Sequence, residues 1–242
     1  MNDSHRPWSI PSRPWVMKQT WHDLLFAHWK IDPTIIKPLI PSSLQLDTYD
    51  GEAWIGVVPF DMSGIRIKYM PPIPYTSSFP EINVRTYVTY EGKPGVYFFS
   101  LDAANLLAVK AARAFFYLPY YNADITVQKE GDKVYYESIR KDSSKPCHFK
   151  GWYKPVSEVF FARKGSLEHW LTERYCLYTT HKTSLYRGEI HHQPWKLQNA
   201  EGEISLNTMI PLEASPSPDK LPLLHYSDQL DVVLWGLEKL EV

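Results

Sequence analysis

The sequence is poor in cysteine and glycine. Only two cysteines, Cys147 and Cys176, occur in 242 residues, and their spacing matches no metal-binding or redox motif. We therefore expect two reduced thiols, with a single disulfide as the alternative. The 11 glycines form no glycine-rich loop of the kind that cradles phosphate groups. The sequence gives no sign of a cofactor, and we expect none.

Long apolar runs and an excess of charge of one sign are also lacking. No stretch approaches the roughly 18–20 apolar residues that a membrane-spanning helix requires, and residues 1–15 lack the apolar core of a signal peptide. The formal net charge is -1, so no overall field attracts nucleic acid or an anionic membrane. We therefore expect a cytoplasmic protein whose partners include neither nucleic acid nor membrane.

Proline and large aromatic residues are abundant instead. The chain holds 20 prolines, 16 tyrosines and 9 tryptophans; tyrosine and tryptophan favour pleated strands, and proline favours short connections. Many strand patterns at roughly 8–12-residue spacing, with few helices between them, indicate a mainly β fold. We expect an antiparallel β-barrel or packed sheets with peripheral helices. Because no linker or repeat divides the chain, we predict one domain over residues 1–242, with residues 1–15 as an extended arm.

The clearest local pattern is a pair of strands followed by a helix. Alternation over residues 81–90 and the apolar run at 96–101 predict two strands joined by a glycine-containing turn. Asp102 is predicted to cap a helix that runs to about Phe116. The residues that we expect to pack this helix on the sheet are Ala104, Leu107, Ala108, Ala111, Ala112 and Phe115.

Two further segments carry turn and cap signals. Asp50-Gly51 is a strong turn signal, and it predicts a hairpin between strands at 44–49 and 52–58. Ser166 is predicted to cap a helix over residues 167–175. Helical periodicity places Arg174 on the outward side of that helix.

Three polar residues, Glu81, Asn83 and Arg85, recur at period two on the first strand of the clear pair. On spacing alone, the simplest interpretation is a solvent-facing strand surface. In a barrel, however, one face of every strand lines the interior. There, Arg85 would bind a carboxylate through two hydrogen bonds, and Glu81 would carry a proton if burial raised its pKa.

Other catalytic signals are weak. The nine histidines show no ligand spacing, so we expect packing or surface roles and no metal site. No Gly-x-Ser-x-Gly nucleophile motif occurs. Lys110 lies among apolar residues on the predicted helix, where a desolvated amine would be nucleophilic. A lysine in this position more commonly extends its amine to water, and we expect that here.

Taken together, these residues resemble the YqjF-like family of uncharacterised bacterial proteins, in the acetoacetate decarboxylase-like superfamily. The resemblance implies a mostly antiparallel β-barrel, or two packed sheets, around a buried cavity with helices outside. It covers most of the chain. The motifs that carry it are FAHW at 26–29, DGEAWIGVVPF at 50–60, PEINVRTYV at 80–88, GVYFFSLDA at 95–103 and ARAFFYLPY at 112–120.

The same resemblance implies the decarboxylase fold but not the decarboxylase activity. In true acetoacetate decarboxylases an arginine precedes a Pro-Lys-Lys sequence, and the first lysine forms a Schiff base with the substrate. Glu81 looks like the cavity glutamate of those enzymes, and Arg113 and Pro119 look like the matching arginine and proline. Tyr120 and Tyr121 occupy the places of the two lysines. Because a phenol cannot form an imine, the resemblance does not extend to that mechanism.

We therefore predict a protein that binds a small anionic or carbonyl-bearing molecule in a barrel cavity, without Schiff-base decarboxylase activity. One alternative is an enzyme of the same fold that uses Glu81 as acid and base. Another is an interaction protein without ligand, a homo-oligomer whose N-terminal arm swaps onto a partner subunit. The residues predicted to bind the ligand are Glu81, Asn83, Arg85, Arg113, Tyr120 and Tyr121.

Overall fold

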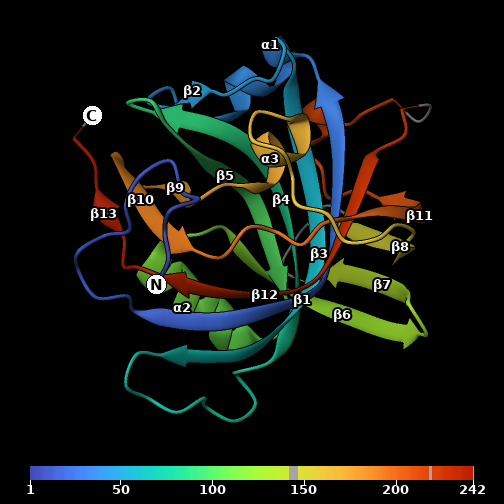
Figure 1. Cartoon of the computed structure of the whole chain (residues 1–242), viewed down its shortest axis with the longest axis horizontal. Helices are drawn as coiled ribbons and strands as arrows, with labels where there is room; N and C mark the ends of the chain where they lie inside the picture. The colour runs from blue at the N-terminus through green and yellow to red at the C-terminus, as the bar shows by residue number, and fades with distance from the viewer. Residues whose placement is uncertain (142–146, 218–219, 242) are drawn as a thin grey trace.

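A computed structural model describes residues 1–141, 147–217 and 220–241. Its described residues form a 13-stranded sheet with few helices, which confirms the mainly β prediction (Figure 1). The strands are β1 (Met17–Ile31), β2 (Gln45–Leu46), β3 (Ala53–Ile67), β4 (Phe79–Tyr90), β5 (Lys93–Ala103), β6 (Tyr120–Glu130), β7 (Lys133–Arg140), β8 (His148–Pro155), β9 (Cys176–His181), β10 (Ser184–His191), β11 (Gln198–Asn207), β12 (Leu223–Leu234) and β13 (Glu238–Lys239). The helices are α1 (Pro33–Ile36), α2 (Leu106–Phe116) and α3 (Leu167–Thr172), with 3-10 helices η1 (Lys37–Leu39) and η2 (Leu212–Ala214).

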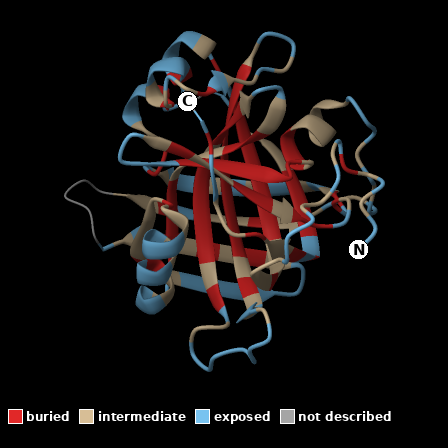
Figure 2. Cartoon of the chain, turned by 90° about the vertical axis from the view of Figure 1, so that its left-hand side faces the viewer, coloured by how far each residue is buried: buried red, intermediate tan, exposed pale blue. Residues whose placement is uncertain are grey.

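The strand pairings return on themselves. Strands β1, β3, β4, β5, β9, β10 and β12 pair in that order, and β12 pairs again with β1. Strands β6, β7, β8 and β11 extend from β5 on one side to β12 on the other. The inner faces of these strands are therefore enclosed, and buried residues concentrate along them, whereas α2 and the hairpin ends are exposed (Figure 2).

The sheet departs from a purely antiparallel arrangement at β5. Strand β5 runs parallel to both β6 and β9, whereas the other strand pairs are antiparallel. The chain leaves β5, passes through α2 and enters β6 in the same direction, as a helical crossover requires. The second parallel neighbour, β9, is paired with β5 only at Val96 and Tyr97.

Strands β4 and β5 lie where the alternation over 81–90 and the apolar run at 96–101 predict them, but the helix after them differs from expectation. Asp102 does not cap α2; it is the second-last residue of β5 and is fully buried. Asn105 caps the helix instead, because its side chain accepts a hydrogen bond from the Ala108 amide. The apolar face that we expected to pack on the sheet is largely exposed, and Val109 is the buried residue of the helix.

The Asp50-Gly51 turn forms, but not between the two strands that we predicted. Both residues have positive φ, 51° and 80°, as a two-residue hairpin turn requires. The pairing across the turn is the isolated bridge between Tyr49 and Glu52, and no longer strand ladder continues from it in the described chain. Strand β2 pairs with β4 rather than with β3, because β4 offers it a free edge next to β3. The expected 44–49 strand is therefore shorter and lies elsewhere in the sheet.

The N-terminal arm packs on the body of its own chain. The guanidinium of Arg6 donates to Glu189 Oε2 at 3.1 Å and lies 4.6 Å from the Tyr175 ring centroid. Trp8 Nε1 donates to the same carboxylate oxygen at 2.9 Å. The side chain of Arg6 has no exposed surface and that of Glu189 is 5% exposed. The arm is thus fixed by a buried ion pair and aromatic contacts.

Replacing Arg6 by methionine is expected to lower the free energy of unfolding by about 2 kcal/mol, the usual contribution of a hydrogen bond to a buried charge. Lys93, 2.7 Å from Glu189 Oε1, still compensates part of the carboxylate charge and limits the loss. Urea unfolding measures the effect. Arg13→Met, at an exposed arginine of the same arm, is the matched control and should change stability by less than about 0.5 kcal/mol. Equal effects of the two changes would contradict the assigned role of Arg6.

Candidate functional site

A cavity of about 90 Å³ lies inside the closed circuit of strands. A single water needs roughly 10–15 Å³ measured in this way, so the space suits a small organic molecule. One side is apolar and includes Trp21, Phe26, Phe60 and Trp195. The polar residues that line it are Gln19, Glu81, Asn83, Arg85, Tyr120, Thr172, Arg174 and His192.

Glu81 is the buried acid of this cavity. Its side chain lies on the inner face of β4, only 3% of the residue is exposed, and the Tyr120 hydroxyl donates to its Oε2 at 2.7 Å. Burial raises the pKa of Glu81 to about 8; the nearby Asp102 charge adds to the rise and the Tyr120 hydrogen bond opposes it. Glu81 is therefore mostly protonated at pH 7 and can donate a proton to a ligand oxygen.

Asn83 and Arg85 follow Glu81 along the same strand. Asn83 is 5% exposed, and its Oδ1 accepts no hydrogen bond from the described residues. The guanidinium of Arg85 lies 5.5 Å from the Phe26 ring centroid, and its buried Nε likewise has no partner in the described chain. A β-bulge between Val84 and Arg85 shifts the register against β5, and such bulges re-aim the side chains beside them.

Arg174 completes the polar lining, and sequence periodicity missed it. Helix α3 ends at Thr172, so Arg174 lies beyond the helix and the predicted outward position is wrong. Its Nη1 donates to Asp47 Oδ2 at 2.6 Å and its Nε to the Trp170 carbonyl at 2.6 Å. Nη2 is buried and has no partner among the described residues. The guanidinium is also stacked against Tyr87, 4.9 Å from the ring centroid, so its orientation is fixed.

The remaining two predicted site residues lie outside the cavity. Arg113, in the last turn of α2, is exposed and donates from Nε to the Tyr120 carbonyl at 2.5 Å. Tyr121 points to the other side of β6, where its ring lies 3.9 Å from the Arg140 guanidinium. Because neighbouring residues of a strand face opposite sides, Tyr120 and Tyr121 cannot both line the cavity. The structure thus brings together Glu81, Asn83, Arg85 and Tyr120.

Arg140 forms a buried ion pair with Asp102 beside the Glu81 side of the cavity. Its Nε and Nη2 donate to the two carboxylate oxygens of Asp102 at 2.8 and 2.7 Å. Asp102 has no exposed side-chain surface and Arg140 has 8%. Asp102 is paired across the sheet with Ile82, the neighbour of Glu81. The pair therefore keeps a charged carboxylate next to Glu81 without exposing it to water.

Within the described residues, no group of three His, Cys, Asp or Glu side chains is arranged to hold a metal ion. Cys176 is a buried free thiol, and burial raises its pKa to about 12. Lys110 is exposed on α2, as expected. None of the helices in the described parts of the chain has the length and apolar character needed to cross a lipid bilayer.

The sequence matches one family model over most of its length. Residues 18–231 match DUF2071, described as an uncharacterized conserved protein. The chain is 53% identical over 231 residues to "Uncharacterized protein YqjF" of Bacillus subtilis (strain 168), an alignment that covers 96% of this chain and 95% of the relative. The resemblance carried by the sequence motifs is therefore confirmed.

Several solved structures share the fold at low sequence identity. An acetoacetate decarboxylase-like enzyme from Sphingomonas wittichii RW1 aligns with a TM-score of 0.64 and 14% identity, over 95% of this chain and 94% of the other. The enduracididine biosynthesis enzyme MppR complexed with pyruvate aligns with a TM-score of 0.63 and 11% identity, over 98% and 95%. The acetoacetate decarboxylase of Legionella pneumophila subsp. pneumophila str. Philadelphia 1 gives 0.62 and 12%, over 97% and 91%. These likenesses concern the fold alone.

Proposed function

This chain belongs to the DUF2071 family of uncharacterized conserved proteins, and from that premise we propose that its cavity binds a small organic acid, an anionic molecule that also bears a carbonyl group. The observation that carries the proposal is the Nη2 group of Arg174. It is a buried charged donor on a residue that lines the cavity, and it has no hydrogen-bond partner in the described chain. Leaving such a donor unsatisfied costs about 1–3 kcal/mol, more for a charged group, and a ligand oxygen removes that cost.

The charges of the cavity suit an anion. Arg85 and Arg174 both line it, and Asp47 accounts for only one of these two positive charges. Glu81 is mostly neutral at pH 7 because burial raises its pKa to about 8. The polar lining is therefore net positive, and a carboxylate bound to the guanidinium groups would compensate it.

Glu81 supplies the complementary donor. Tyr120 donates to its Oε2, so the acid proton of Glu81 is available on Oε1 for a carbonyl or carboxylate oxygen of the ligand. Two proteins of similar structure are associated with small oxo acids: MppR, complexed with pyruvate, and an acetoacetate decarboxylase. These molecules combine a carboxylate and a ketone, the two groups that this cavity is equipped to bind.

The proposed function is binding without an imine intermediate. The residues that line the cavity include no lysine in the described chain. The position that follows Pro119, a lysine in the resembling decarboxylases, is Tyr120, and its hydroxyl is bonded to Glu81. A phenol cannot condense with a ketone to form a Schiff base, so decarboxylation by that route is not part of the proposal.

A second candidate is an enzyme that uses Glu81 as acid and base. The observation in its favour is a buried carboxyl group that lines the cavity, has a pKa of about 8 and accepts a hydrogen bond from the Tyr120 hydroxyl. A pKa near the working pH favours proton transfer in both directions. Loss of turnover in Glu81→Gln with ligand affinity retained at pH 7 would support this candidate over simple binding.

The affinity for an anion should depend on the protonation of Glu81. Above pH 8 the ionised Glu81 repels a carboxylate, so the wild-type affinity for pyruvate or acetoacetate should fall about tenfold per pH unit. Glu81→Gln, which cannot ionise, should bind with an affinity that stays constant from pH 6 to pH 9. The fluorescence of Trp21 and Trp195, stacked 5.9 Å apart in the cavity wall, reports binding. An equal pH dependence in both proteins, or no binding of either acid, would contradict the proposal.

A further inference from the structure

The wall of the cavity is interrupted on one edge of β5. On that edge β5 pairs with β9 at Val96 and Tyr97, and with β6 from Leu101 to Ala103. Residues 98–100 between them pair with no strand on this edge in the described chain. The sheet is therefore open at this point, and side chains rather than backbone close the wall.

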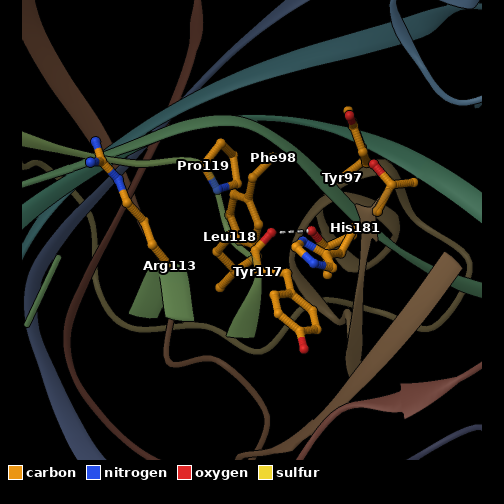
Figure 3. A pocket seen from close by; sticks show the side chains of 9 residues that line it. Tyr97, Phe98, Arg113, Tyr117, Leu118, Pro119 and His181 are labelled. Carbon is orange, nitrogen blue, oxygen red and sulfur yellow. Dashed lines mark hydrogen bonds between the residues drawn. The ribbon is translucent and has the colours of Figure 1, made fainter. Parts of the chain in front are cut away.

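A surface cleft of about 220 Å³ lies outside this interruption (Figure 3). Its floor and sides come from β5, the connection after α2, and the end of β9. Tyr117 and His181 stack there with ring centroids 4.1 Å apart and planes within 13°. The residues that line the cleft are Tyr97, Phe98, Arg113, Tyr117, Leu118, Pro119, Thr179, Thr180 and His181.

Phe98 and Leu118 are the two residues that line both the outer cleft and the inner cavity. In Figure 3 they lie together in the middle of the cleft, while the guanidinium of Arg113 points away from them. Phe98 lies at the bulge opposite Val84 and Arg85. The two spaces are thus separated by two apolar side chains, with Arg85 of the binding cavity close behind.

The backbone that carries Leu118 is fixed on both sides. Thr179 Oγ1 donates to the Tyr117 carbonyl at 2.6 Å, and the Leu101 amide donates to the Pro119 carbonyl at 3.0 Å. Tyr117 ends α2 with φ of 50°, a conformation that few residues other than glycine adopt. Because the backbone is held, a change of rotamer at Phe98 and Leu118 is the least disruptive way to connect the two spaces.

We propose that the cleft is the mouth of the binding cavity, and that Phe98 and Leu118 form the gate through which its ligand enters and leaves. This inference rests on the proposed function for the identity of the ligand. The opening itself is a property of the protein and can be measured without any ligand.

Cys176 offers that measurement, because it lines the inner cavity and not the cleft. In a Cys147→Ser background, Cys176 is the only thiol. Methyl methanethiosulfonate, a small neutral reagent, labels it at a rate that mass spectrometry follows. Leu118→Ala should accelerate labelling at least tenfold, and Leu118→Phe should slow it to a similar degree. Leu101→Ala is the matched control, since Leu101 is also buried and lines the cavity alone.

The outcomes separate the gate from general loosening of the fold. Labelling that accelerates in Leu118→Ala but changes less than about threefold in Leu101→Ala supports the gate. Equal acceleration in the two variants means that the reagent enters by unfolding, and it overturns the proposal, as does an unchanged rate in Leu118→Ala. Because no ligand is present, the result is independent of the pyruvate and acetoacetate titrations, so failure of the proposed function would be recognised separately.

Discussion

Replacing Glu81 by glutamine is expected to stabilise the protein by about 3 kcal/mol at pH 7. The pKa of Glu81 is about 8 in the folded protein against an ordinary value of 4.5, so between these pH values the folded chain holds a proton that the unfolded chain releases. The stability contributed by neutral Glu81 is complete below pH 4.5 and is lost as the pH rises through 8. Between pH 4.5 and pH 7 the loss is about 1.36 kcal/mol for each pH unit. The loss accumulated at pH 7 is therefore about 3 kcal/mol. Glutamine resembles the neutral acid and cannot ionise, so the variant does not undergo this loss of stability.

Urea unfolding of wild type and Glu81→Gln at pH 4.5, 6 and 7.5 measures this effect. The two free energies should be similar at pH 4.5 and diverge steadily as the pH rises, in favour of the variant. Glu203→Gln, at an exposed glutamate of β11, is the control and should show no such divergence. A Glu81→Gln protein less stable than wild type at pH 7.5 would mean that the ionised carboxylate is the form that the fold stabilises.

Replacing Arg140 by methionine is expected to destabilise the protein by about 3–5 kcal/mol. The change removes both hydrogen bonds from Arg140 to Asp102, whose side chain is completely buried. Loss of one partner of a buried ion pair is costly because the remaining charge is no longer compensated. The negative charge of Asp102 also lies near Glu81, and it raises the pKa of Glu81 in the wild-type protein. The pKa of Glu81 should therefore rise further in Arg140→Met.

A double-mutant cycle tests this interaction. Asp102→Asn removes the buried charge, so Arg140→Met combined with Asp102→Asn should be clearly more stable than the sum of the single effects predicts. Chemical unfolding of the four proteins gives the coupling free energy, which we expect to be at least about 2 kcal/mol. Additive effects would show that the pair contributes through packing alone.

Local signals in the sequence were reliable where they concerned neighbouring residues. The alternation of β4, the turn at Asp50-Gly51 and the cap at Ser166 all appear in the structure. Glu81, Asn83 and Arg85 share one face of β4, as period two requires. Which face of the strand points inward depends on the circuit of pairings that joins β1 to β12, and no local pattern contains that information.

The errors arose where distant residues decide the local structure. Asp102 is an N-cap residue type, but it remains in β5 because Arg140, 38 positions later, binds it. Helical periodicity predicts that Arg174 lies on a helix face, but the helix stops at Thr172. Its burial depends on Asp47, 127 positions earlier. The resemblance predicts Arg113 in the cavity, whereas α2 lies outside the sheet and keeps this side chain at the surface.

The side chains in the cavity differ from what decarboxylation through a Schiff base requires, although the fold is shared. The chain shares its fold with an acetoacetate decarboxylase, and it places a buried glutamate in its cavity. Tyr120 bonds to that glutamate instead of offering an amine. Two guanidinium groups provide the positive charge. The proposal for this chain is therefore that its cavity binds an organic acid without imine chemistry.

The most direct test of that account is a binding experiment with matched acids and amides. Saturation-transfer NMR at pH 7 compares acetate, pyruvate, acetoacetate and 2-oxobutyrate with the corresponding neutral amides, on wild type, Arg174→Met and Arg85→Met. Thermal unfolding of each variant confirms that it is folded at the temperature used. The account predicts that oxo acids bind the wild-type protein, that the amides do not, and that both arginine variants lose most of the binding. Acids and amides that bind alike, or acids that bind Arg174→Met as well as wild type, would contradict it.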